Sequence, residues 1–243
     1  METKPIARRH HYLPQVYLAA FTSTGSKDDQ FIVLDVQSGR PFRTSPKNVA
    51  AERDFNRVDI EGRSPDAIEQ ALAPFEGQAA AAIRNVIASE EFPNAEDCNW
   101  ILNLLGLIAV RNPQLRKSFN RSREQVIHRI GDLLVSDKKL WEHHVKKARE
   151  SGENIRDDVS FEDMKQFIEE RKYRLEFLPE GNLRVEFHAF DKLLPVLGER
   201  TWSVLVAPND GPEFVCSDHP VTLVWKSGKY GPVGYGFSFT TDR

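Results

Sequence analysis

The chain has 243 residues, of which 40% are hydrophobic. That length and apolar content are enough to build a sizeable core, so they exclude a chain that is disordered throughout. The 33 basic residues nearly balance the 36 acidic ones, and a formal net charge of −3 excludes a global attraction to nucleic acid while leaving room for a local basic patch.

The cysteines and the N-terminus bear on where the protein works. Cys98 and Cys216 match neither a metal-binding pair nor a disulfide framework, so we expect free thiols in a reducing compartment. The N-terminal segment contains no apolar run that could serve as a signal peptide. The most apolar stretch, 100–110, is about half as long as a membrane span. We therefore expect a cytoplasmic protein without a membrane segment.

The first sixty residues predict two short helices and a hairpin. Apolar residues at helical spacing predict a helix over 11–21. An apolar run, a glycine-containing turn and a returning run predict a β-hairpin over 31–44. Ser45 followed by Pro46 is typical of a helix start, so we expect one or two helical turns over 47–54.

The middle of the chain predicts a helical bundle. Apolar residues recur there at spacings of three or four, which is the period of one face of a helix. A basic segment at 114–123 follows the most apolar of these helices. The predicted helices cover 64–89, 94–110, 124–135, 139–150 and 160–177.

Apolar runs near the C-terminus predict strands. Two of them, 202–207 and 214–217, flank a Pro-Asn-Asp-Gly turn signal, and a third covers 221–225. Before them, 183–188 fits either a strand or the start of a helix that continues over 190–197.

These elements together predict an α+β fold, in which a central helical bundle joins an N-terminal β-hairpin and C-terminal antiparallel strands. We expect a single domain over 1–243. Its parts would be a helix and hairpin segment at 1–60, a helical region at 64–180 and a C-terminal β segment at 183–243.

The run from Arg8 to Gln15 places two guanidiniums, two adjacent imidazoles, a phenol and a carboxamide within eight residues, a density of titratable and hydrogen-bonding groups that ordinary packing does not require. Neighbouring side chains diverge by about 100° on a helix and about 180° on a strand, so one metal ion would rarely bind both His10 and His11. One histidine could coordinate a metal while the other orients a carboxylate or binds a phosphate beside Arg9. The alternative is a segment that docks by its aromatic residues, with both imidazoles bonded to backbone carbonyls.

Three further places carry candidate side chains. Ser217 and Asp218 lie at a predicted strand end, where Asp218 could bind a metal, act as a base or cap a turn. Asp54 ends a predicted short helix and could face the histidines or only solvent. Arg111 leaves the most apolar helix, and a buried guanidinium needs a carboxylate partner or an anion.

Several common motifs are absent. The sequence has no Walker A loop, no dinucleotide glycine fingerprint after a strand, no H-E-x-x-H and no G-x-S-x-G elbow. This argues against the usual nucleotide-binding, zinc-protease and serine-hydrolase classes.

Separated motifs resemble those of one family. His-His-Tyr-x-Pro-Gln-x-Tyr-Leu-x-x-Phe at 10–21, followed by Thr-Ser-Pro-Lys-Asn-Val-Ala-Ala-Glu-Arg-Asp-Phe at 44–55, resembles the bacterial domain-of-unknown-function family numbered 4238. Ser-Asp-His-Pro at 217–220 is similar to its Ser-Asp-x-Pro element, and Arg-Asn-Pro at 111–113 to its central Arg-x-Pro. The resemblance implies shared positions in a bacterial protein without assigning them roles. Family members typically continue past the glycine-rich segment, so it also implies a C-terminal β segment truncated at Arg243.

We expect the candidate residues to share one cleft. The predicted catalytic residues are His10, His11, Asp54 and Asp218, and the predicted substrate-binding residues are Arg9, Tyr12, Gln15, Arg111 and Ser217. The first hypothesis is a hydrolase-type site for a phosphodiester or another anionic substrate, nucleic acid included, with a divalent metal ion as an open choice of cofactor. The alternative is a non-catalytic module that binds a ligand or a partner protein.

Overall fold

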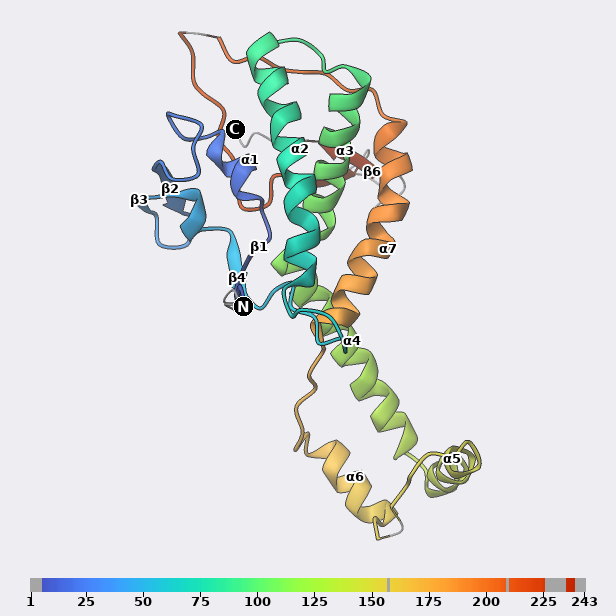
Figure 1. Ribbon diagram of the computed structural model, residues 1–243. Coiled ribbons are helices and arrows are strands. Elements are labelled where there is room, and N and C mark those ends of the chain that lie inside the picture. Colours follow the sequence, from blue (N-terminus) through green and yellow to red (C-terminus); the bar gives the residue numbers. More distant parts are fainter. Residues whose placement is uncertain (1–5, 157, 209, 226–234, 239–243) are drawn as a thin grey trace. The chain divides into compact units, whose positions relative to one another are not determined.

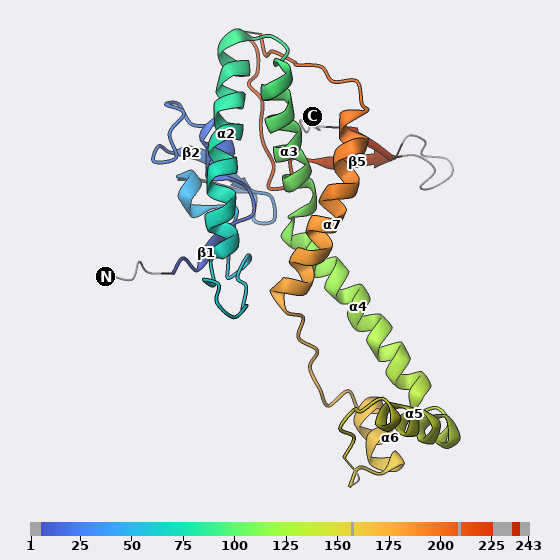
Figure 2. The same ribbon diagram turned by 45° about the vertical axis from the view of Figure 1, so that its right-hand side comes forward.

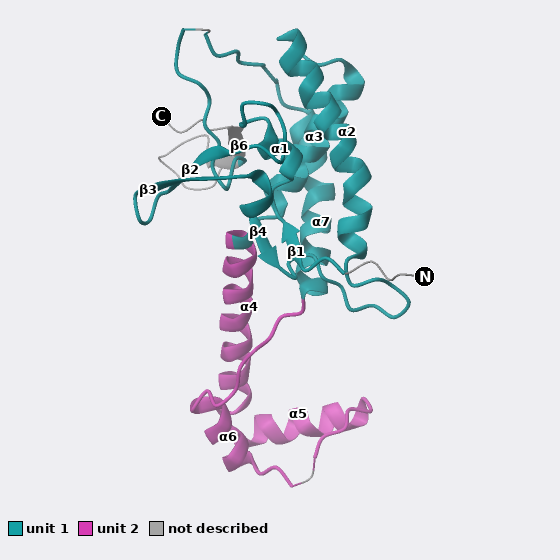
Figure 3. Ribbon diagram, turned by 60° about the vertical axis from the view of Figure 1, so that its left-hand side comes forward, with its two compact units in different colours: residues 1–113, 179–243 teal, residues 114–178 magenta. Residues whose placement is uncertain are grey.

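The structure is a computed structural model that describes residues 6–156, 158–208, 210–225 and 235–238 (Figure 1). The chain forms two compact units, one of residues 1–113 and 179–243 and one of residues 114–178 (Figure 3). Helices dominate, and antiparallel strand pairs accompany them, so the predicted α+β class is confirmed. The single domain stays a prediction.

The N-terminal part of the first unit is built on a short strand pair. β1 (Arg9–His11) pairs antiparallel with β4 (Ala51–Arg53). The chain between them forms α1 (Gln15–Ala19), the strands β2 (Phe31–Asp35) and β3 (Arg40–Thr44), and the 3-10 helix η1 (Pro46–Asn48). β2 and β3 pair with each other, which confirms the predicted hairpin.

The helix predicted over 47–54 is wrong. Only η1 forms, and the chain then extends into β4. Ala50 and Asp54 adopt left-handed φ angles of 51° and 57°, which a right-handed helix does not contain. The helix predicted over 11–21 is likewise shorter, because His11 belongs to β1. In both places pairing between distant segments overrides the local helix signal.

Three long helices form the helical part of the first unit. α3 (Ala95–Val110) packs between α2 (Ala67–Ser89) and α7 (Pro179–Gly198), as Figures 1 and 2 show. α3 begins where the sequence predicts, because the Asn94 side chain accepts the backbone N–H groups of Glu96 and Asp97 at 2.9 Å. The segment 183–188 belongs to α7, so it is the helical alternative that forms.

One apolar core connects these parts. Leu13 and Leu18 come from the N-terminal segment, and they meet Ala79 of α2 and Leu104 of α3 there. α7 contributes Leu197. The apolar residues that follow the two histidines therefore anchor the N-terminal segment to all three long helices.

The strands predicted over 202–207 and 214–217 are wrong, because these segments pair with no other strand among the described residues. One apolar side chain from each segment packs on the core of the helices instead. Trp202 and Cys216 pack against the core, and the Trp202 indole N–H donates to the Leu197 carbonyl at 2.8 Å. The third predicted strand is confirmed as β5 (Thr222–Trp225), which pairs with β6 (Tyr235–Ser238).

The second unit consists of α4 (Pro113–Leu134), α5 (Lys138–Glu150) and α6 (Phe161–Glu169). α4 includes the basic segment as well as the helix predicted after it. Residues 161–177 run along one side of α4: Arg171 pairs with Asp132 at 2.7 Å, and the Tyr173 hydroxyl lies 2.8 Å from His128 Nδ1. α6 ends before the predicted limit of 177.

The contact between α3 and α7 depends on a glycine. A Cβ atom at Gly106 would lie 3.1 Å from side-chain carbons of both Phe190 and Leu194. We predict that Gly106→Val overpacks this contact and lowers the free energy of unfolding by about 1–3 kcal/mol, measured by urea denaturation.

The matched control is Gly77 in α2, where a Cβ would meet nothing within 4 Å. Gly77→Ala should raise the free energy of unfolding by about 0.5–1 kcal/mol, because alanine loses less backbone entropy in a helix. Equal stability of Gly106→Val and the wild type would contradict the packing of α3 on α7.

Candidate functional site

His10 is buried, with 1% of its surface exposed, and both of its ring nitrogens are hydrogen-bonded. The backbone N–H of Asn56 donates to Nδ1 at 2.8 Å, so Nδ1 carries no proton. Nε2 carries it instead and donates to the Ala7 carbonyl at 2.9 Å. His10 therefore joins β1 to the chain that follows β4, and neither ring nitrogen is left for a metal ion or a substrate.

His11 points to the other face of β1, because successive side chains alternate along a strand. Its Nε2 lies 3.3 Å from the Lys47 carbonyl, and the Gln15 amide lies 3.2 Å from Nδ1. Burial is the main reason that the pKa of His11 lies below its usual value of 6.5, and the positive charge of Arg9 adds to this. The Lys47 carbonyl and Glu69 oppose the shift. His11 is thus an uncharged imidazole at neutral pH.

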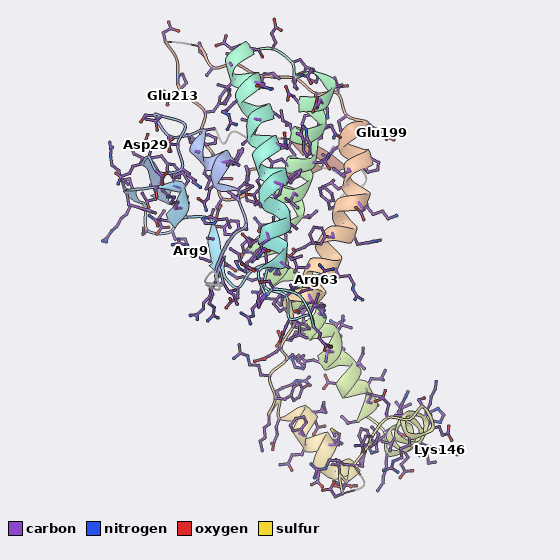
Figure 4. The ribbon with its side chains drawn as sticks, viewed as in Figure 1. Arg9, Asp29, Arg63, Lys146, Glu199 and Glu213 are labelled. Carbon is purple, nitrogen blue, oxygen red and sulfur yellow. The ribbon has the colours of Figure 1, made fainter. Side chains whose placement is uncertain are left out.

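Two arginines share the His11 face of the strand pair. Arg9 lies directly opposite Arg53, and directly opposed residues in an antiparallel pair point to the same side. Both side chains are exposed, and Arg9, which is labelled in Figure 4, donates to the Asn48 carbonyl. Like charges in this position are destabilising on their own. The pair therefore forms a concentrated positive charge beside His11.

Asp54 lies close to this face but is engaged by Arg8. The Arg8 guanidinium donates to both carboxylate oxygens, at 3.1 Å from Nε to Oδ1, and the Asp54 backbone N–H donates to the Arg8 carbonyl at 2.7 Å. Arg53 Nε lies 3.6 Å from the same carboxylate. The hydrogen bonds from Arg8 hold the pKa of Asp54 below its usual range. Asp54 stays ionised and ties the N-terminus to the end of β4.

A group of charged side chains lies between the strand pair and the long helices. Arg111, with 2% of its surface exposed, follows α3 and donates to the His11 carbonyl at 3.5 Å. Burial raises the pKa of Glu76 to about 7, a shift that Arg111 opposes and Glu69 reinforces. Glu69 also accepts the side-chain amide of Asn56. The carboxyl of Glu76 therefore titrates near neutral pH beside a buried positive charge.

The predicted residues near the C-terminus approach the N-terminal segment at Tyr12. Burial raises the pKa of Tyr12, and the charges of Asp218 and Glu52 add to the shift, which places both carboxylates near the phenol. Asp218 is exposed. The Ser217 hydroxyl accepts the His219 backbone N–H at 3.2 Å, so it caps the turn at this point.

The structure thus sorts the predicted residues into three places. His11, Gln15 and Arg111 lie together with the carboxylates of α2, while Arg9 adjoins them on the surface. Tyr12 lies near Asp218, and Asp54 lies at Arg8. The catalytic and binding roles of all nine residues stay predictions. Among the described residues, no group of three or more His, Cys, Asp or Glu side chains could hold a metal ion.

Sequence reasoning missed Glu69, Glu76 and Arg53. The two glutamates are seven positions apart, which places them on the same side of α2, and each directly follows an apolar residue of the core-facing stripe. Carboxylates at the edge of an apolar stripe are a signal that could have identified them. No local signal marks Arg53, because its position opposite Arg9 depends on the pairing of β1 with β4.

A family model described as a protein of unknown function (DUF4238) matches residues 9–241, so the predicted family is confirmed. No curated protein and no solved structure matches the chain. Within the described residues, no helix has the length and apolar character needed to cross a membrane. The bacterial source and the cytoplasmic location stay predictions.

The first prediction from the site concerns His10. His10→Ala removes the acceptor of a buried backbone N–H and leaves a cavity, so we expect the free energy of unfolding to fall by about 2–4 kcal/mol in urea denaturation. His188→Ala, at an exposed position of α7, should change it by less than about 0.5 kcal/mol. Equal effects of the two substitutions would contradict the structural role of His10.

The second prediction concerns Glu76 and pH. Its pKa is about 7 in the folded chain against the usual value of 4.5, so the folded state holds an extra proton between these pH values and loses stability as pH rises through them. Glu76→Gln cannot titrate. We therefore expect the melting temperature of Glu76→Gln, relative to the wild type, to rise as pH goes from below 4.5 to above 7.

Glu96→Gln is the control, because Glu96 is exposed in the first turn of α3. Its melting temperature at neutral pH should stay close to that of the wild type. A constant difference between Glu76→Gln and the wild type across this range would show that Glu76 is an ordinary carboxylate.

Proposed function

The chain belongs to the DUF4238 family of proteins of unknown function, and we propose that it is a hydrolase with an acid–base site for an anionic substrate such as a phosphodiester. The observation that carries the proposal is the buried Arg111, which donates to the His11 carbonyl at 3.5 Å and acts on Glu76, a carboxyl whose pKa burial raises to about 7. Perturbed pKa values of this kind cluster at functional sites.

The electrostatic effects among these groups support one connected site. Arg9 and Glu69 both act on His11, and Glu69 and Arg111 both act on Glu76. His11 and Glu76 therefore share Glu69 as a neighbour. The exposed Arg9 lies at the outer side of the group, while Arg111 lies at its buried side.

Arg9 and Arg53 supply the affinity for an anion in this proposal. An anion between the two opposed guanidiniums would relieve their repulsion, and guanidiniums bind phosphate oxygens with two parallel hydrogen bonds. Arg53 is well suited to this, because 73% of its side chain is exposed.

Glu76 is the proton carrier in this proposal. A general acid or base works best when its pKa lies near the working pH, so a carboxyl with a pKa of about 7 can take a proton from water and return it to a leaving group. Arg111 keeps the ionised form accessible by opposing the effect of burial. His11 offers Nδ1 as a second proton acceptor, at the atom that now faces the Gln15 amide.

The non-catalytic alternative rests on a different observation. Both nitrogens of His11 are hydrogen-bonded and Asp54 is held by Arg8, so the N-terminal segment itself offers an anion only the paired guanidiniums. A module of this kind would bind an anionic ligand at Arg9 and Arg53 without turning it over.

We predict that the purified chain hydrolyses bis(4-nitrophenyl) phosphate and that Glu76→Gln lowers kcat by about 100-fold or more, because general acid–base catalysis contributes about 10²–10⁴ in rate. The rate should change with pH around 7, following the titration of Glu76. Arg53→Ala should raise KM with a smaller effect on kcat.

Two variants serve as controls. Glu96→Gln removes an exposed carboxylate from α3, and Arg84→Ala removes an exposed guanidinium from α2. Both should keep the wild-type kcat and KM. Hydrolysis that is equal in the wild type and Glu76→Gln would contradict the acid–base role. A different result would favour the binding module over the hydrolase. In that case the wild type would bind the phosphodiester without hydrolysing it, and Arg53→Ala would abolish the binding.

A further inference from the structure

The second unit carries an exposed apolar surface along α4. Six large apolar side chains of this helix are between 39% and 63% exposed, and five of them share one side of it. At 100° per residue these five fall within a sector about 60° wide, over a length of about 27 Å. These residues, which we call the α4 stripe, are Leu115, Phe119, Val126, Ile130 and Leu133.

α6 and the segment as far as Tyr173 contact a different side of α4 from the stripe, whereas Phe177 contacts Arg123 at the edge of the stripe, with its ring centroid 4.3 Å from the guanidinium carbon. His128, Gly131 and Asp132 make the contacts with residues 168–173. These three positions lie roughly opposite the stripe on a helix of 3.6 residues per turn. α4 therefore has one side that packs within the second unit and a second side whose apolar residues are at least 39% exposed.

An exposed apolar stripe of this kind indicates a surface that binds another helix or protein. Water-soluble chains rarely leave a contiguous apolar strip of this length exposed, because burying it in an interface is favourable. Apolar residues that share one helix face at spacings of three, four and seven are the pattern by which helices pair side by side.

The order of residues in the α4 stripe fits a second copy of the same helix. Leu115 and Leu133 lie nine positions on either side of residue 124, and Ser122 and Val126 lie two positions on either side. In an antiparallel pair, Leu115 of one copy would therefore contact Leu133 of the other. Val126 of one copy would lie over the small Ser122 of the other. Phe119 would meet Ile130, which lies almost the same distance from the centre.

The charges along α4 select the antiparallel arrangement. Residues 113–123 contain four basic residues and no acidic one, whereas 124–134 contain Glu124 and Asp132 against the single Arg129. In a parallel pair, the half of α4 with a charge of +4 would lie beside the same half of the other copy. In an antiparallel pair, it lies beside the half with a charge of −1. Opposed helix dipoles favour the same arrangement.

We propose that the α4 stripe is a self-association surface through which two copies of the chain pair by antiparallel α4 helices. The pair is isologous, with a two-fold axis near residue 124, and this is the commonest symmetry among soluble oligomers. The surface is independent of the acid–base site proposed for the first unit, since none of its residues belongs to that site.

Sedimentation velocity of the full chain at rising concentration tests the proposal. We expect a dimer of the wild type and a monomer of Val126→Lys, because an ammonium buried at the centre of the stripe should lower the association constant by more than about 100-fold. Gln125→Lys is the matched control, since it adds the same charge at the next exposed position, away from the stripe. It should remain a dimer.

Disulfide trapping tests the direction of the pair. In a background without the two native cysteines, Ser118→Cys protein mixed with Arg129→Cys protein should give a cross-linked heterodimer, and neither protein alone should cross-link efficiently. Self-cross-linking of Ser118→Cys would instead indicate parallel helices and overturn the register. A wild type that stays monomeric at high concentration, or a dimer that Val126→Lys leaves unchanged, would overturn the surface itself.

Discussion

The arrangement of the first unit depends on one hydrogen bond, from the backbone N–H of Asn56 to Nδ1 of His10. It joins two segments that are 46 positions apart and holds β1 against β4. Because side chains alternate along β1, fixing His10 on the inner face directs Arg9 and His11 to the other. Leu13 and Leu18 then enter the core of the long helices. The paired histidines thus have different tasks: one holds the segment in place and the other belongs to the charged group.

Burial of charge gives that group its chemistry. Arg111 follows the most apolar helix and remains buried. Its positive charge therefore changes the relative free energies of the protonated and ionised forms of nearby carboxyl groups. For Glu76 the effect of burial is larger than the opposing effect of Arg111, so its pKa is raised to about 7. The exposed pair of Arg9 and Arg53 adds a positive surface on the same side of the strands as His11. A carboxyl that titrates near neutral pH, linked through Glu69 and His11 to exposed arginines, suits a hydrolytic site for an anionic substrate, which is why we propose that function.

The sequence predicts those features whose signals lie in neighbouring residues, and it does not predict those that depend on contacts between distant segments. The capped start of α3 and the hairpin of β2 and β3 carry their signals in neighbouring residues, and both were predictable. The segment 47–54 becomes a strand because β1, far away in the sequence, pairs with it. The surroundings of His10 and Glu76 depend on burial between such distant segments. Residue type alone made His10 a candidate site residue, but it could not show that both ring nitrogens are hydrogen-bonded. The position of Glu76 beside Arg111 likewise needed the packing of α2 on α3.

The most direct test of this account is the pKa of the Glu76 side chain itself, measured by carbon-detected NMR titration of the glutamate carboxyls in the folded chain, with Glu76→Gln to assign the signal. The account predicts a midpoint of about 7, and a lower midpoint in Glu69→Gln, because Glu69 reinforces the shift. A Glu76 midpoint near the usual value of 4.5 would contradict it, since the proposed proton carrier would then be an ordinary solvated carboxylate.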